Sequence, residues 1–265
     1  MDKLILGRYV PGQSVLHRLD PRSKLLAMMM FILIIFWANN LVTNVLALAL
    51  VLGLVFLSRI SLSYFIQGIL PMLGLIAFTT MFQLFFTSAG QPIANIWFLT
   101  ITDKGLEMSL LIFSRFLLII LFSTLLTLTT TPLSLSDAVE SLLKPLKPLK
   151  VPAHEIGLML SLSLRFVPTL MDDTVRIMNA QRARGVDFGE GNLIQKVKSV
   201  IPILIPLFAS SFKRAESLAL AMEARGYQGG DGRTKYRQLS WQHRDTLAIL
   251  VMILFAVALF YLKNS

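Results

Sequence analysis

Long apolar runs dominate this sequence and constrain its fold more than any other feature. A helix that crosses the hydrocarbon core of a bilayer needs about 20 mostly apolar residues. Runs that approach or reach this length occur at Leu25–Ala38, Val45–Leu57, Phe65–Phe86, Met108–Leu128 and Leu247–Leu262. They predict an all-α, polytopic membrane protein with about five transmembrane helices.

The first two runs are separated by a polar cluster of Asn39, Asn40, Thr43 and Asn44. One helix over residues 25–57 would be about 50 Å long, whereas the hydrocarbon core of a bilayer is about 30 Å thick. We therefore predict two short spans that are joined at the asparagine cluster.

The basic residues indicate an orientation. With five spans, every Lys and Arg falls on the side of the N-terminus except Lys104, Arg115 and Lys263. Basic flanks of transmembrane segments stay in the cytoplasm. We therefore expect a cytoplasmic N-terminus, a cytoplasmic segment 132–246 and an extracellular C-terminus. The residues that determine this most firmly precede the first run, and they are Lys3, Arg8, Arg18, Arg22 and Lys24.

Residues 132–240 fit neither a loop nor a clear span. The segment is too long for a helix connection and too apolar for disorder. Its apolar runs, Ile156–Met171 and Val200–Phe212, are short and contain prolines. We predict helices on the membrane surface or against a partner, over 153–170, from 172 to Gly185 and from Leu193 to Arg225; two additional spans are the alternative. The expected domains are 1–131 (N-terminal segment and four spans), 132–240 (cytoplasmic) and 241–265 (last span).

The sequence lacks the residues that several kinds of chemistry require. It has no cysteine, no G-x-x-x-x-G-K-[ST] motif for nucleotide phosphates, and no acidic residue in the five runs that could relay protons or sodium. The three histidines show no metal-ligand spacing. We expect no catalytic residue, no cofactor, no metal and no nucleic-acid partner.

Two further features concern the membrane segments. Arg115 lies inside an apolar run, and we interpret it as a structural residue. Residues 1–20 contain no apolar region typical of a cleavable signal peptide.

One short motif occurs twice. Ala183-Arg184-Gly185 and Ala224-Arg225-Gly226 each end a predicted helix, and an aromatic residue follows each. Arg in a last turn and Gly just past it are ordinary helix stops. The repetition favours a second interpretation, since a guanidinium at a helix tip is suited to pairing with carboxylates. Such a tip would fit an acidic groove on a partner.

The whole chain resembles the T components of energy-coupling factor (ECF) transporters. The residues that carry the resemblance are the segment 17–24 (HRLDPRSK) before the first run, and the two Ala-Arg-Gly triplets before the last run. The resemblance implies a multi-pass protein of a prokaryotic plasma membrane, in which both triplets (183–185 and 224–226) end coupling helices. Each triplet would dock on one of two ABC-type ATPases, which bind the ATP. The apolar faces of these helices would pack against a membrane-embedded S component for vitamin or trace-metal uptake.

Two other functions are considered. A stand-alone secondary transporter would place polar groups at mid-membrane, and the sequence offers almost none. A membrane-embedded enzyme acting on lipid would need a cluster of His, Asp and Glu at one interface. The acids of the segment 132–240 could supply one, although they look more like helix caps and solvated turns.

Overall fold

The computed structural model describes residues 9–87, 90–96, 99–188, 192–229 and 238–263. The chain divides into two compact units, residues 1–138 with 238–265 (unit 1) and residues 139–237 (unit 2). Lys3 and Arg8 of the basic N-terminal segment lie outside the described residues. The predicted functional domains, with boundaries at 132 and 240 and a cytoplasmic middle part, stay predictions.

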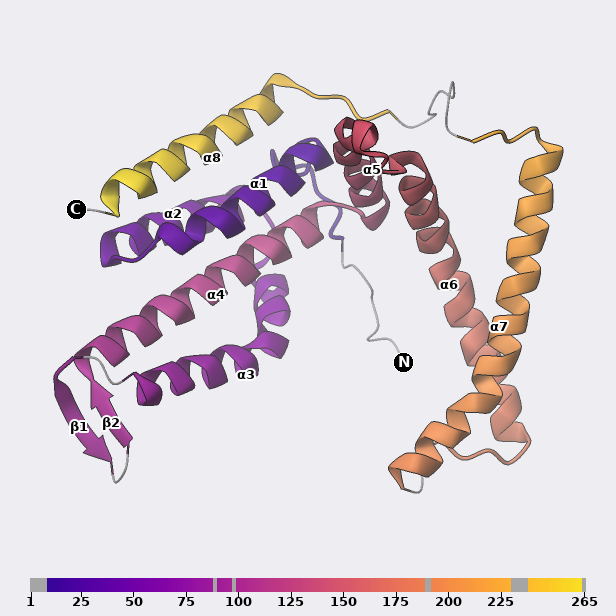
Figure 1. Ribbon diagram of the computed structural model, residues 1–265, viewed down its shortest axis with the longest axis horizontal. Coiled ribbons are helices and arrows are strands. Elements are labelled where there is room, and N and C mark those ends of the chain that lie inside the picture. The colour runs from indigo at the N-terminus through magenta and orange to yellow at the C-terminus, as the bar shows by residue number, and fades with distance from the viewer. Residues whose placement is uncertain (1–8, 88–89, 97–98, 189–191, 230–237, 264–265) are drawn as a thin grey trace. The chain divides into compact units, whose positions relative to one another are not determined.

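Apart from connecting loops and one short hairpin, the described residues are helical, which confirms the predicted all-α fold class (Figure 1). Unit 1 contains α1 (Pro21–Ile34), the 3-10 helix η1 (Ile35–Trp37), α2 (Leu41–Ser58), α3 (Leu62–Phe86), β1 (Pro92–Ile96), β2 (Leu99–Thr102), α4 (Asp103–Thr129) and α8 (His243–Leu262). The helix α5 (Pro132–Leu143) runs across the boundary into unit 2, which continues with η2 (Lys144–Leu149), α6 (Ala153–Ala183) and α7 (Leu193–Ala224). The strands β1 and β2 are antiparallel and lie between α3 and α4.

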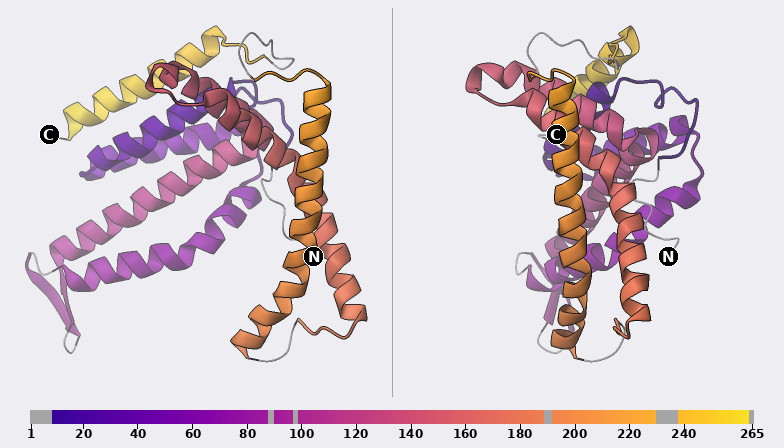
Figure 2. Two further views of the ribbon diagram at one scale, coloured as in Figure 1. Left: turned by 45° about the vertical axis from the view of Figure 1, so that its right-hand side comes forward. Right: turned by 90° about the vertical axis from the view of Figure 1, so that its right-hand side faces the viewer.

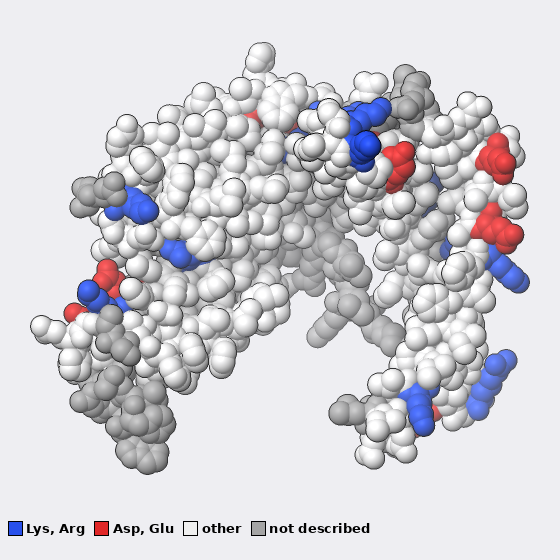
Figure 3. All heavy atoms as spheres, viewed as in Figure 1, with Lys and Arg blue, Asp and Glu red and all other residues white. Residues whose placement is uncertain are grey.

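Among the described residues, four helices are long and apolar enough to cross a membrane, namely α2, α3, α4 and α8. They coincide with the last four predicted runs, so the polytopic membrane fold is confirmed. The helix α1 has 14 residues and is therefore only about 21 Å long. The number of five spans accordingly stays a prediction. Figure 3 shows few charged side chains over α1, α4 and α8.

The asparagine cluster separates two helices, as predicted. The helix α1 passes into η1, whose C-cap is Ala38, and α2 begins after its N-cap Asn40. Asn40 N–H donates to Thr43 Oγ1 (3.0 Å), which satisfies a backbone group at the helix start. From α4, Arg115 donates to the Ala38 carbonyl (3.2 Å) and to Asn39 Oδ1 (3.3 Å). Arg115 therefore holds this turn, which agrees with the structural role expected from the sequence.

The core of unit 1 lies where α1, α2, α4 and α8 meet. Phe31 of α1 is fully buried and stacks on Phe122 of α4, with ring centroids 4.6 Å apart. It also stacks on Phe255 of α8 at 6.2 Å. Val51 of α2 is fully buried in the same cluster. The helix α3 packs along α4 and leaves most of its apolar side chains exposed (Figure 1), as expected for a surface that faces lipid.

A buried polar network joins three helix ends of unit 1. The carboxylate of Asp245, at the start of α8, accepts hydrogen bonds from Asp20 N–H (2.7 Å) and Ser23 Oγ (2.8 Å). Lys24 donates to the Thr129 carbonyl (2.9 Å) at the end of α4. The starts of α1 and α8 and the end of α4 therefore lie at one end of the unit.

The helix α6 corrects one sequence-based expectation. We predicted a break near residue 171, whereas α6 is continuous from Ala153 to Ala183 with Pro168 inside it. Proline removes one backbone donor and crowds the preceding turn, but residues on both sides keep their helical hydrogen bonds. The helix α7 likewise contains Pro202 and Pro206.

Candidate functional site

The helices α6 and α7 form an antiparallel pair. Arg214 of α7 donates to Asp173 Oδ2 of α6 at 2.7 Å. Toward the other end of α6, Gln181 Nε2 donates to the Pro202 carbonyl (3.3 Å). Residues later in α6 thus contact residues earlier in α7. The two helices therefore lie side by side and run in opposite directions (Figure 2).

This arrangement places the two Ala-Arg-Gly triplets at opposite ends of the pair. The first triplet follows the end of α6, and the second follows the end of α7 (Figure 1). The helix α7 has 32 residues. Because the end of α6 lies beside Pro202, the triplets are separated along the pair by the part of α7 from Pro202 to Ala224, which is roughly 33 Å long at about 1.5 Å per residue. The structure therefore separates the six predicted site residues into two copies of one motif rather than one pocket.

The first triplet closes α6 with a Schellman motif. Gly185 N–H donates to the Arg182 carbonyl (3.0 Å), and Val186 N–H donates to the Gln181 carbonyl (3.0 Å). Gly185 has a φ of 85°, in the left-handed region. A Cβ at Gly185 would meet nothing within 4 Å, so the glycine is needed for its backbone conformation and not for space.

The second triplet repeats this geometry bond for bond. Gly226 N–H donates to the Glu223 carbonyl (2.8 Å), and Tyr227 N–H donates to the Met222 carbonyl (3.0 Å). Gly226 has a φ of 71°, and a Cβ there would also meet open space. The two motifs therefore present their middle residue, Arg184 or Arg225, in the same way.

Both arginines are available for a partner. Arg184 and Arg225 are the C-cap residues of α6 and α7, with nearly equal φ values of −88° and −90°. Both side chains are exposed, and neither forms an ion pair within the part of the chain that the structure describes. Ala183 and Ala224 are also exposed and add little bulk. Each helix tip can therefore offer a planar guanidinium for bidentate pairing with a carboxylate.

The surroundings of the triplets include residues that the sequence alone did not assign. Tyr227, directly after the second triplet, lies with its hydroxyl 3.4 Å from His154 Nε2, at the start of α6. His154 Nδ1 lies 3.4 Å from Glu140 of α5. After the first triplet, Phe188 lies under the guanidinium of Arg182, 5.8 Å from the ring centroid. The aromatic residue behind each triplet was the available signal, and only the structure shows what each one contacts.

A stripe of apolar side chains lies exposed along α7. The stripe is formed by Ile194, Val197, Ile201, Ile205, Phe208 and Phe212, with exposed fractions of 47–72%. Their spacing of three or four residues places them on one helix face. The face toward α6 carries Ile203, which is buried, and Arg214, which pairs with Asp173. Because Ile205 follows Ile203 by two residues, or about 200° around the helix, the stripe points away from α6.

Fold and site together define a class of protein. A polytopic membrane unit is joined to a pair of helices that expose two matching arginine tips and an apolar stripe. Among the described residues, no group of His, Asp and Glu is arranged to hold a metal ion. The features that stand out are surfaces for contact with other proteins, as in a membrane subunit of a larger assembly.

Comparison with known proteins identifies the family. The sequence pattern of the CbiQ family, described as cobalt transport protein, matches residues 12–236. The energy-coupling factor transporter transmembrane protein EcfT of Streptococcus equi subsp. equi is 72% identical over 264 residues, covering 100% of this chain and 98% of that protein. The EcfT proteins of Streptococcus thermophilus and Bacillus subtilis are 67% and 50% identical, over 100% and 99% of this chain and 100% and 99% of their own lengths. This chain therefore belongs to the family of EcfT transmembrane proteins of ECF transporters, which confirms the resemblance inferred from its sequence.

Membership of this family makes the chain a membrane component of a bacterial transporter. A role as a transporter subunit also agrees with the expectation that the chain is not itself an enzyme. The comparisons identify the family, and the assignment of the two triplets to a docking role stays a prediction.

Proposed function

We propose that this chain couples two ABC-type ATPase subunits to a membrane-embedded S component, and so drives vitamin or trace-metal uptake. Ala183-Arg184-Gly185 docks on one ATPase and Ala224-Arg225-Gly226 on the other. The chain itself binds neither substrate nor ATP and holds no cofactor, since ATP is bound by the partner subunits.

The observation that carries this proposal is the identity of the two helix ends. Both end in a Schellman motif with the same two hydrogen bonds, and both expose a C-cap arginine that forms no ion pair with any residue that the structure describes. A single helix stop needs no functional explanation. Two stops with the same sequence and geometry, at opposite ends of one helix pair, fit two equivalent grooves on two similar partners.

The helix pair is built to transmit motion between its ends. The ion pair Asp173–Arg214 and the hydrogen bond from Gln181 to the Pro202 carbonyl hold α6 against α7. When ATP binding closes the two ATPases, the docked tips move with them. Because a helix resists bending over this length, the motion reaches the apolar surface of α7.

The apolar stripe on α7 is the proposed contact with the S component. Its side chains face away from α6 and are exposed, and an exposed apolar surface of this length marks an interaction site. Motion of α7 would shift the surface that holds the S component, and substrate would be released as that partner reorients.

The orientation follows from the same scheme. ATP is available in the cytoplasm, so both triplets must be cytoplasmic. This requirement agrees with the basic residues around the first span, which favour a cytoplasmic N-terminus, and it places the C-terminus outside.

The test reverses the charge at both tips. In an Arg184→Glu, Arg225→Glu double variant, we expect the ATPases to be lost from the purified complex and uptake to fall to background. An Arg176→Glu, Lys213→Glu double variant is the matched control, since it changes charge equally at exposed positions on α6 and α7 away from the tips. Normal uptake and normal ATPase recovery in the first variant would refute the docking role of the triplets.

A further inference from the structure

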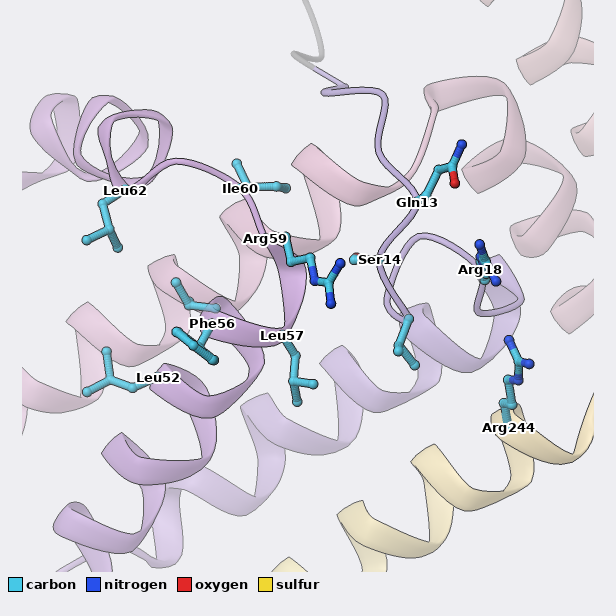
Figure 4. Close-up of a pocket in the computed structure, with 12 residues that line it drawn as sticks. Gln13, Ser14, Arg18, Leu52, Phe56, Leu57, Arg59, Ile60, Leu62 and Arg244 are labelled. Carbon is cyan, nitrogen blue, oxygen red and sulfur yellow. The ribbon is translucent and has the colours of Figure 1, made fainter.

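A cavity of about 780 Å³ lies in unit 1, whereas the residues of the proposed docking site belong to unit 2. It is formed where the segment before α1, the end of α2 and the start of α8 meet (Figure 4). Three arginines line it, one from each of these segments, and they are Arg18, Arg59 and Arg244. The opposite wall is apolar and includes Leu52, Phe56 and Leu57.

Among the described residues, the three arginines have no acidic partner. All three side chains are exposed, and none forms an ion pair with another described residue. The neighbouring Asp245 forms no ion pair with Arg244, and its buried carboxylate accepts instead from Asp20 N–H and Ser23 Oγ. Figure 4 shows Arg244 extending toward Arg18, and Arg59 extending from the end of α2 toward Ser14. These exposed guanidinium groups would attract an anion that enters the cavity.

The backbone at Arg59 is also unusual. Arg59 caps α2 in the left-handed conformation, with a φ of 55°, and its N–H donates to the Phe56 carbonyl (3.2 Å). Glycine adopts this conformation without steric cost, whereas arginine does not. The structure thus holds a strained arginine where the chain turns past the cavity, and such strain is often found at binding sites.

A second cavity, of about 590 Å³, adjoins the first. The two share Val15, Leu57 and Arg244 as lining residues. Beyond them the second cavity is mostly apolar, with walls from α1, α2, α4 and α8, although Ser23, Lys24, Thr129 and His243 also line it. Gly53 of α2 lines it, and a Cβ at Gly53 would meet nothing within 4 Å.

From this arrangement we infer that an anionic phospholipid binds here, with its phosphate at Arg18, Arg59 and Arg244 and an acyl chain in the apolar cavity. The charges recognise a phosphate, which Arg binds through paired hydrogen bonds. The adjoining groove requires a ligand that is apolar beyond its head group. The cavity lies at the ends of the apolar helices α2 and α8, at the level of lipid head groups. The ends of α2 and α8 at this cavity are expected to face the cytoplasm. The cytoplasmic leaflet of the membrane is rich in anionic lipid.

The head-group half of the inference is tested on the full chain, purified in mild detergent and stripped of lipid. Bound lipid is counted by native mass spectrometry as phosphatidylglycerol or phosphatidylcholine is added. We expect phosphatidylglycerol to bind more tightly than phosphatidylcholine. An Arg18→Gln, Arg59→Gln, Arg244→Gln triple variant should weaken phosphatidylglycerol binding about a hundredfold. An Arg176→Gln, Lys198→Gln, Lys213→Gln variant removes the same charge from unit 2 and should bind normally. Equal binding of the two lipids by the native chain would overturn the inference.

The acyl-chain half is tested by Gly53→Leu, which places a side chain in the open space of the second cavity without changing charge. We expect it to weaken phosphatidylglycerol binding, whereas Gly74→Leu, in α3 and also facing open space, should leave binding unchanged. Circular dichroism checks that each variant is folded. Inorganic phosphate should not displace the lipid. Displacement by phosphate, together with normal binding by Gly53→Leu, would show a simple anion site and overturn the assignment to lipid.

Discussion

The two units of this chain differ in how they use apolar side chains. In unit 1, apolar residues from four helices pack against one another, and Phe31, Val51, Leu118 and Leu259 are fully buried. In unit 2, α6 buries only Ala153 and Gly157 within the helix itself. On α7, Ile203 is the buried apolar residue among those described, while the stripe from Ile194 to Phe212 is exposed.

The difference shows that the units depend on different surroundings. Unit 1 has a core of its own and an apolar exterior that lipid can cover. Unit 2 consists of long amphipathic helices with no comparable core, and most of the stability of such helices comes from packing of the apolar face. Unit 2 therefore needs partners to cover that face, which is consistent with a protein that works inside a larger assembly.

The strongest test of this comparison is a pair of phenylalanine truncations. Phe31→Ala removes a buried ring that stacks on Phe122 and Phe255, and we expect it to lower the free energy of unfolding by about 3 kcal/mol. Phe208→Ala, on the exposed stripe, should change it by less than about 0.5 kcal/mol in the isolated chain. Thermal unfolding of the purified chain in detergent measures both. Equal losses would mean that the stripe is packed within the free chain, contrary to the comparison.

The polar network of unit 1 should also be important for stability. Asp245→Ala leaves the Asp20 N–H and the Gln242 N–H without the carboxylate that accepts from both, and we expect a loss of about 2 kcal/mol in the free energy of unfolding. Asp245→Asn keeps one acceptor oxygen and should lose less. Asp172→Ala, at an exposed position of unit 2, is the control and should be close to neutral. Thermal unfolding in detergent ranks the stability of the three variants. If Asp245→Ala unfolds like the native chain, the polar network does not hold the helix ends together.

The glycines of the two triplets should matter locally rather than globally. Gly185→Ala and Gly226→Ala place a Cβ on a left-handed backbone, at a cost of about 1 kcal/mol each. We expect faster amide hydrogen exchange in the last turns of α6 and α7. Less of the ATPase subunits should co-purify with the chain, whereas the free energy of unfolding of unit 1 should not change. Gly74→Ala, in α3 with ordinary φ and open space around it, controls for the added methyl group. Normal exchange in the variants would show that the Schellman motifs tolerate a side chain.

The sequence predicted the features that depend on local pattern. Apolar runs of span length predicted α2, α3, α4 and α8, and the asparagine cluster predicted the turn before α2, because both signals act within about 20 residues. The ends of α6 and α7 were predicted for the same reason, since Arg and Gly at a helix end are local signals. The break expected near residue 171 was wrong, because α6 continues as one helix from Ala153 to Ala183 and accommodates Pro168 within it.

Other features could not be read from the sequence because they depend on distant contacts. No pattern around Asp245 indicates that it accepts a hydrogen bond from Asp20, 225 residues earlier. Similarly, the arginines of the cavity were assigned to topology or left unassigned, since nothing in the sequence shows that Arg18, Arg59 and Arg244 line the same cavity. The antiparallel pairing of α6 and α7, which separates the two triplets, also required the structure.

Substitutions in the exposed stripe of α7 are expected to have the smallest effect on stability. They therefore separate an effect on assembly from an effect on folding most clearly. A Phe208→Ser, Phe212→Ser variant removes two exposed rings, so unfolding of the isolated chain should hardly change. If the stripe holds the S component, the same variant should weaken retention of that partner about tenfold or more, while ATPase recovery stays normal. Phe208→Leu, Phe212→Leu keeps the surface apolar and should restore retention. Should both variants retain the S component fully, another surface of the chain must hold that partner, and the exposed stripe would need a different occupant.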